Sequence, residues 1–125
     1  MAKVLGIGGV FFKAEDTTAV KDWYRRVLGF EITDWGGVIF PPAEGGMQVW
    51  SPFAGDSDYF APSKAAFMIN LRVDDIDGVL ERVRREGVEP LGAEDQGGMG
   101  RFAWLLDPAG VKVELWQPAE DAPGS

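Results

Sequence analysis

One short phrase occurs twice in this sequence and carries residues that could do chemistry. Residues 47–52 read MQVWSP, and residues 113–118 read VELWQP. Alternate residues of an extended strand share one face, so Gln48 lies beside Trp50 in one copy and Glu114 beside Trp116 in the other. A carboxylate can act as a general acid or base, and an amide can orient a guest by donating and accepting hydrogen bonds. The repeat therefore predicts a polar site with aromatic walls.

A third polar stretch lies in the apolar segment AAFMINLRV, residues 65–73. Met68, Asn70 and Arg72 alternate there and so share one face of a predicted strand. Asn70 needs a hydrogen-bond partner wherever it is buried, which a guest or the backbone could supply. Arg72 could bind a carboxylate through two parallel hydrogen bonds, or it could be solvated at the end of the strand.

Three tryptophans in predicted strands could form a wall for a flat or cationic guest. Sheet packing or a dimer interface is the alternative for these rings. We expect a guest to contact the following residues: Phe11, Gln48, Trp50, Met68, Asn70, Arg72, Trp104 and Trp116.

The composition excludes several classes of site and partner. Histidine and cysteine are absent, so the chain has no Ser-His-Asp triad, thiolate nucleophile or imidazole metal ligand. The net charge of −8, without a basic stripe, argues against nucleic-acid binding and could attract a cationic small molecule. The chain shows neither a membrane-spanning apolar run nor a secretory signal, which predicts a cytoplasmic protein with no membrane partner.

Apolar spacing predicts two amphipathic helices, one from Asp16 to Gly29 and one from Asp74 or Asp75 to Gly87. Predicted strands flank each helix in the order β-α-β-β-β. They lie at residues 3–14, 30–34, 37–41 and 46–52 in the first half, and at residues 65–73, 88–92, 101–107 and 111–118 in the second half. The sequence therefore predicts an α+β fold of two tandem βαβββ modules.

The expected organisation is one domain over residues 1–125. Module one spans about 1–52, a connector 53–64, module two about 65–118, and a tail 119–125. The connector is rich in turn-forming residues, but its aromatic residues Phe53, Tyr59 and Phe60 indicate that it is packed. A cleft between two such modules is where we expect the site.

Three stretches resemble the vicinal oxygen chelate superfamily, which is also called the glyoxalase/bleomycin resistance protein/dioxygenase superfamily. They are VFFKAEDTTAVKDWYRRVLGFEI (10–32), NLRVDDIDGVLERVRREGVEPLG (70–92) and GRFAWLLDPAGVKVELWQP (100–118). The resemblance implies paired βαβββ modules forming a cupped mixed sheet, with helices on its outer face, and a homodimer. It also implies four metal-ligand positions, which in this chain are Gly9, Gln48, Met68 and Glu114.

These four residues are a poor metal-binding set. Gly9 offers no ligand atom, and the thioether of Met68 suits hard divalent ions badly. We therefore expect no cofactor. If a divalent metal does bind, Gln48 and Glu114 are its expected ligands, with water completing the coordination.

Three kinds of function remain open. We favour a protein that binds a small organic molecule, such as a cationic aromatic compound, in the cleft between modules. The alternative is a lyase, isomerase or dioxygenase-type enzyme, using either a sparse divalent metal site at Gln48 and Glu114 or metal-free acid–base catalysis by Glu114. The third is a structural or regulatory module whose cleft is filled by side chains.

Overall fold

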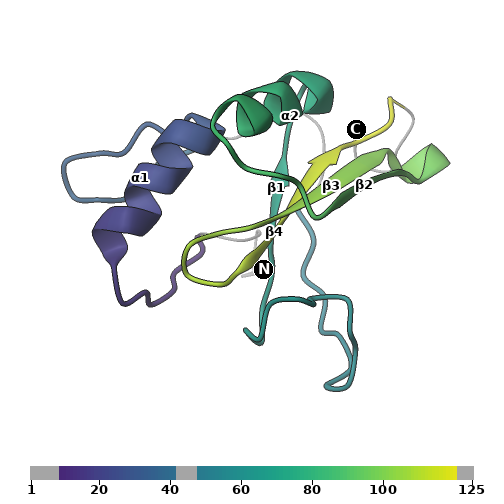
Figure 1. The fold of residues 1–125 in the computed structure, drawn as a ribbon. Coiled ribbons are helices and arrows are strands. Elements are labelled where there is room, and N and C mark those ends of the chain that lie inside the picture. The colour runs from purple at the N-terminus through teal and green to yellow at the C-terminus, as the bar shows by residue number, and fades with distance from the viewer. Residues whose placement is uncertain (1–8, 42–47, 121–125) are drawn as a thin grey trace, which may run out of the picture.

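A four-stranded mixed sheet with two helices on one face forms the fold, as Figure 1 shows. The computed structural model describes residues 9–41 and 48–120. Within them the sheet order is β1-β4-β3-β2, with β1 parallel to β4 and the other neighbours antiparallel. The elements are α1 (Thr17–Leu28), β1 (Ile69–Arg72), α2 (Ile76–Arg85), β2 (Gly92–Asp95), the short 3-10 helix η1 (Gly97–Met99), β3 (Arg101–Leu106) and β4 (Lys112–Gln117). The predicted α+β class is confirmed.

Both helices begin at a side-chain cap. The carboxylate of Asp16 accepts a hydrogen bond from the Ala19 amide at 2.9 Å, and that of Asp75 accepts one from the Gly78 amide at 3.2 Å. These caps satisfy backbone donors that a helix start leaves without intrahelical partners. Gly29 ends α1 with φ of 73°, a left-handed conformation that glycine adopts without steric cost. The predicted helix boundaries are confirmed, with Asp75 rather than Asp74 as the second cap.

The core lies between the two helices and one face of the sheet. Apolar stripes of α1 and α2 meet the inward-facing residues of β3 and β4 in a single cluster. Its buried members are Val20, Trp23, Tyr24, Val27, Ile76, Leu80, Val83, Ala103, Leu105, Val113 and Leu115. Neither α1 nor α2 has the length and apolar character needed to cross a membrane.

The second predicted module forms, whereas the described residues of the first contain its helix but no strand. The order β1-α2-β2-β3-β4 is a complete βαβββ unit. Residues 30–34 and 37–41, and the described parts of the other two predicted strands, 9–14 and 48–52, contain no strand. A strand needs a paired edge and a covered face. α1 packs beside α2 on the sheet of the second module, so among the described residues it covers no separate sheet of the first.

The strand predicted at residues 88–92 is displaced along the chain. Strand β2 begins at Gly92, because Val88 donates its amide to the Val83 carbonyl at 3.1 Å and so belongs to the end of α2. Pro90 has no backbone N–H to offer a ladder. β2 therefore shares only Gly92 with the predicted strand and ends at Asp95, three residues beyond it.

A buried carboxylate fixes the turn between β3 and β4. Asp107 accepts hydrogen bonds from the Ala109 and Val111 amides, both at 2.9 Å, which builds the turn of the DPAG sequence. It also accepts one at 2.7 Å from the Tyr24 hydroxyl, which ties α1 to the sheet. Burial and the neighbouring Asp107 carboxylate raise the pKa of Tyr24 well above the ordinary tyrosine value.

Tyr24→Phe tests this tie. Removing the hydroxyl leaves a buried acceptor with one donor fewer, so we expect the free energy of unfolding to fall by about 1–3 kcal/mol. Urea denaturation at neutral pH measures the change. An unchanged unfolding midpoint would contradict the assignment.

The same variant should alter the pH dependence of stability. The unfolded phenol ionises near pH 10, whereas the folded Tyr24 stays protonated, so its contribution is intact below about pH 10 and is lost above it. Wild type should therefore lose stability more steeply than Tyr24→Phe as the pH rises past about 10. Equal slopes would contradict the raised pKa.

Candidate functional site

The helix-free face of the sheet brings several predicted site residues together. On β4, Val113 and Leu115 point into the core, so Glu114 between them points to the opposite face. Register pairs Glu114 with Asn70 of β1 on one side and with Trp104 of β3 on the other. These three residues are therefore neighbours across three adjacent strands.

Glu114 as a residue is 7% exposed, and its carboxylate accepts three hydrogen bonds. Asn70 Nδ2 donates to Oε1 at 2.7 Å, and Trp104 Nε1 donates to Oε2 at 2.7 Å. The Tyr59 hydroxyl donates to Oε2 at 2.5 Å. All three donors are neutral, and a buried carboxylate needs such donors because leaving it unpaired is costly. Glu114 is thus the centre of a polar cluster.

Tyr59 comes from the connector, which lies on the side of the sheet opposite α2 in Figure 1. Its ring stacks on Phe53, with centroids 5.5 Å apart, and meets Trp104 edge-on at 6.3 Å. Burial, followed by the hydrogen bond to Glu114, raises the pKa of Tyr59 to about 12. The composition of the connector predicted that it is packed, but no sequence pattern placed Tyr59 in the site. The aromatic residues of the connector were the sequence feature that could have indicated a contact with the site.

Lys112 places a positive charge beside the same rings. Its Nζ donates to the Tyr59 carbonyl at 2.6 Å, and it lies 5.1 Å from the Tyr59 ring centroid and 5.5 Å from that of Trp104. An ammonium group over aromatic faces is an attractive contact. The cluster therefore contains both a carboxylate and a cation.

A ladder of parallel rings continues the site along the face. Trp104 and Phe102 are 6.5 Å apart with an interplanar angle of 11°, and Phe102 and Trp116 are 6.0 Å apart at 8°. The indole of Trp116 donates to the Met99 carbonyl at 2.7 Å. The ladder contains two of the three tryptophans expected in the wall, whereas Trp50 is 79% exposed and outside any strand. Phe102 was missed because it lies in the continuous apolar run FAWLL.

The remaining predicted residues lie around or away from this cluster. Met68 immediately precedes β1 and is partly buried, while Arg72 ends β1 and is exposed. Phe11 is 91% exposed, and Gln48 is also exposed, each in a segment without regular secondary structure. The structure thus joins Asn70, Trp104 and Glu114, with Trp116 in the adjoining ladder.

The four family metal positions do not form a convincing ligand set. Within residues 9–41 and 48–120, no group of three or more His, Cys, Asp or Glu side chains is placed to hold a metal ion. Glu114 is the one carboxylate at these positions, and its two oxygens already accept three hydrogen bonds. Gly9 and Met68 offer a hard cation no oxygen side chain. The donor set does not fit a transition-metal centre.

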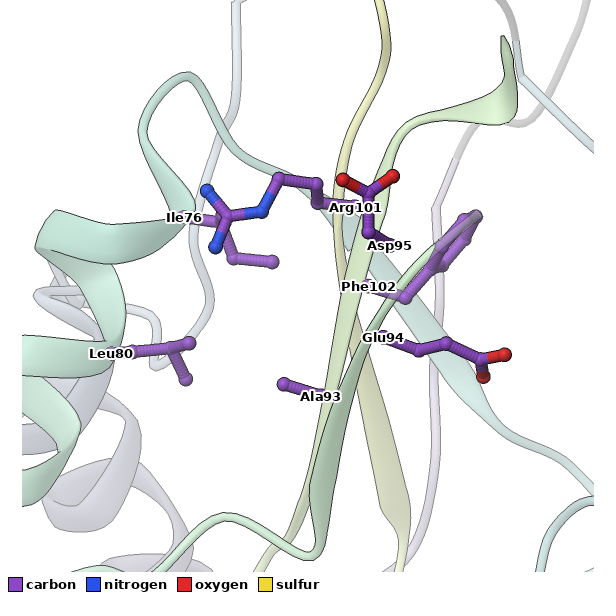
Figure 2. Close-up of a pocket in the computed structure, with 7 residues that line it drawn as sticks. All are labelled: Ile76, Leu80, Ala93, Glu94, Asp95, Arg101 and Phe102. Carbon is purple, nitrogen blue, oxygen red and sulfur yellow. The ribbon is translucent and has the colours of Figure 1, made fainter. Parts of the chain in front are cut away.

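A pocket of about 490 Å³ lies away from Glu114, between α2 and the paired strands β2 and β3. Figure 2 shows Ile76 and Leu80 projecting from α2 toward Ala93, with Asp95 and Arg101 at one end. A second pocket, of about 410 Å³, lies beside the start of α1. Neither of these two pockets in the described chain is lined by a predicted site residue. Beside Glu114 the structure places the hydroxyl of Tyr59.

Comparison with known proteins adds a family and a set of similar folds. The family model described as the Glyoxalase/Bleomycin resistance protein/Dioxygenase superfamily matches residues 6–115. No curated protein is a significant match to the sequence.

Three solved structures illustrate the likeness. A glyoxalase/bleomycin resistance protein from Catenulispora acidiphila DSM 44928 is 26% identical, over 85% of this chain and 92% of that one, with a TM-score of 0.51. A glyoxalase/bleomycin resistance protein from Streptomyces sp. CB03234 is 25% identical, over 83% and 93%, with a TM-score of 0.52. TnmS3, an antibiotic binding protein from the same Streptomyces strain, is 24% identical, over 85% and 89%, with a TM-score of 0.55.

The tie between Tyr59 and Glu114 can be tested by titration. The chain has two tyrosines, so in a Tyr24→Phe background the near-ultraviolet tyrosinate absorbance reports Tyr59 alone. We expect a midpoint near pH 12 that moves down in Glu114→Gln, because the negative charge beside the phenol is removed. It should stay above the ordinary value of about 10, since burial persists. A midpoint that Glu114→Gln leaves unchanged would contradict the contact. Circular dichroism at each pH checks that both variants remain folded.

Proposed function

The chain belongs to the glyoxalase/bleomycin resistance protein/dioxygenase superfamily, and from that premise we propose that it binds a small organic molecule on the helix-free face of its sheet, beside Glu114. The proposal includes binding without a divalent metal at the four family positions. One observation carries it: a buried carboxylate whose hydrogen-bond donors come from three separate segments, next to a ladder of aromatic rings.

This cluster has the chemistry of a binding site. Aromatic faces give a flat guest a large contact area, and a single carboxylate fixes its orientation through a hydrogen bond. One of the three donors, Tyr59, belongs to an irregular segment and not to the sheet. A guest that carries its own donor could take the place of that hydroxyl without disturbing any strand.

The similar structures support binding as a role for this fold. TnmS3 is an antibiotic binding protein, so the architecture can serve a protein that captures an organic molecule. At 24% identity the likeness concerns the fold, and the guest of TnmS3 is not assigned to this chain. The family also includes enzymes, and Glu114 is the side chain through which acid–base catalysis would act. Its contacts with three donors favour holding a guest over moving protons.

We also propose that a second copy of this chain covers the apolar surface of the first half. Large apolar side chains are exposed there: Val10, Phe11, Ile39, Phe40, Val49 and Trp50. An exposed surface of this kind marks an interaction site. In a homodimer, Phe11 and Trp50 would be buried against the partner, and β1, the edge strand of the sheet formed by the described residues, belongs to the same sheet as the site.

Sedimentation equilibrium measures the oligomeric state. We expect a mass of about twice that of the 13.6 kDa chain, and a lower mass for the variant carrying both Phe11→Asp and Trp50→Asp. Charges placed in an apolar interface oppose association. A wild-type mass of 13.6 kDa at high protein concentration would contradict the dimer.

Calorimetric titration with flat aromatic compounds tests the binding site. The panel contains a cation, 9-aminoacridine, and a neutral phenol, 2-naphthol. We expect one of them to bind saturably, and Glu114→Gln to weaken that binding about tenfold, the effect of losing a hydrogen bond to a charged group.

Glu81→Gln is the matched control, because Glu81 is an exposed carboxylate on α2, on the opposite side of the sheet. It changes the net charge equally and should leave the affinity as it is. An equal loss of affinity in Glu114→Gln and Glu81→Gln would show that the compound responds only to the net charge of the protein. If Glu114→Gln leaves the affinity for the compound unchanged, the compound binds elsewhere on the protein. If no compound of the panel binds, the proposed function is contradicted.

A further inference from the structure

The segment that covers Glu114 is not part of the sheet. Residues 53–63 of the connector, here called the strap, form successive turns that are closed by backbone hydrogen bonds within the segment. These bonds run from Ser57 to Ala54, from Ala61 to Asp58 and from Ser63 to Phe60, at 2.9–3.0 Å. Since the strap satisfies these groups internally, it could move off the face without breaking a strand ladder.

Two residues of the strap hydrogen-bond to the sheet and its turn. Tyr59 does so twice, through its hydroxyl to Glu114 and through its carbonyl to Lys112. Ser63 donates its hydroxyl to the Gly110 carbonyl at the other end of the strap. Tyr59 is therefore the contact that holds the middle of the strap over the site.

The Tyr59 side chain has the form that a guest of this site would need. It presents a flat ring edge-on to Trp104 and donates a hydroxyl hydrogen to a carboxylate that can only accept. We propose that Tyr59 is an internal occupant of the binding site, and that a guest binds by displacing its phenol and donating to Glu114 in its place. This inference rests on the proposed function and names the class of guest for it.

The class is a neutral aromatic molecule with a hydroxyl donor, which is the chemistry of a phenol. An acceptor-only molecule would place a lone pair against the Glu114 oxygens, which is repulsive. A cationic ring would meet the Lys112 ammonium, which already lies over the faces of Tyr59 and Trp104. The net charge of −8 draws cations toward the protein at long range, but this local charge favours a neutral guest at the site.

Displacement predicts that wild type binds more weakly than a variant without the competing hydroxyl. In Tyr59→Phe the ring stays and the hydrogen bond to Glu114 is lost, so a guest no longer exchanges one donor for another. We expect 2-naphthol to bind about tenfold more tightly to Tyr59→Phe, and more tightly again to Tyr59→Ala, which also removes the ring. 2-Methoxynaphthalene, which has the same ring system without a donor, should bind more weakly than 2-naphthol to each protein.

Calorimetry on wild type and the two variants separates the outcomes. If wild type binds 2-naphthol and both variants bind it equally or more weakly, Tyr59 is a wall of the site and not a competitor. The inference then fails while the proposed function stands. Equal affinities for the two naphthalenes would also overturn it, because no donor would then be needed.

A second measurement tests the occupant without a naphthalene. p-Cresol carries the ring and hydroxyl that Tyr59→Ala lacks, so it should raise the thermal unfolding temperature of that variant more than toluene does. Phe53→Ala is the matched control: it removes a ring of the strap that makes no hydrogen bond to Glu114, so p-cresol should have no advantage over toluene there. An equal response of Tyr59→Ala to the two compounds would overturn the inference, even if no larger guest binds to any variant.

Discussion

A carboxylate that is shielded from water must be given hydrogen-bond donors, because burying an unpaired charge costs several kcal/mol. Glu114 meets this constraint with Asn70 from β1, Trp104 from β3 and Tyr59 from the strap. The same requirement therefore orients two side chains of the sheet and holds an irregular segment across it. Lys112, over the rings of Tyr59 and Trp104, adds a positive charge to the cluster. The arrangement of side chains on the helix-free face follows from the need to give the Glu114 carboxylate hydrogen-bond donors.

At the four positions where the family resemblance implies metal ligands, the chain has one carboxylate, one amide, a thioether and a glycine. Divalent ions prefer several charged or imidazole ligands, which this set does not offer. Neutral donors satisfy the Glu114 carboxylate, and parallel aromatic rings continue along the same face of the sheet. In the proposed function, a site of this composition would recognise an organic guest by its shape and its donor group. The chain belongs to the superfamily, and the side chains of this site are the basis on which binding is proposed for it.

The sequence predicted most of what depends on local rules. The sequence predicted the helix cap at Asp16, the end of the helix at Gly29 and the alternation that sets Glu114 on the outer face. Each of these features depends on neighbours within a few residues. Residues 30–34 and 37–41 were predicted as strands and are not, because a strand also needs a partner edge and a helix to cover it, and α1 packs beside α2 instead. Tyr59 meets Glu114 across 55 residues of sequence, so no periodicity could pair them.

The proposed site requires that neutral donors, and not a metal, hold Glu114. A crystal structure of the protein grown with Mn²⁺, with anomalous scattering used to locate the ion, tests this directly. The account predicts the Glu114 oxygens within hydrogen-bond distance of Asn70 and Trp104, with the third donor supplied by Tyr59 or by a guest hydroxyl. A manganese ion bound between the side chains of Gln48 and Glu114 would contradict it.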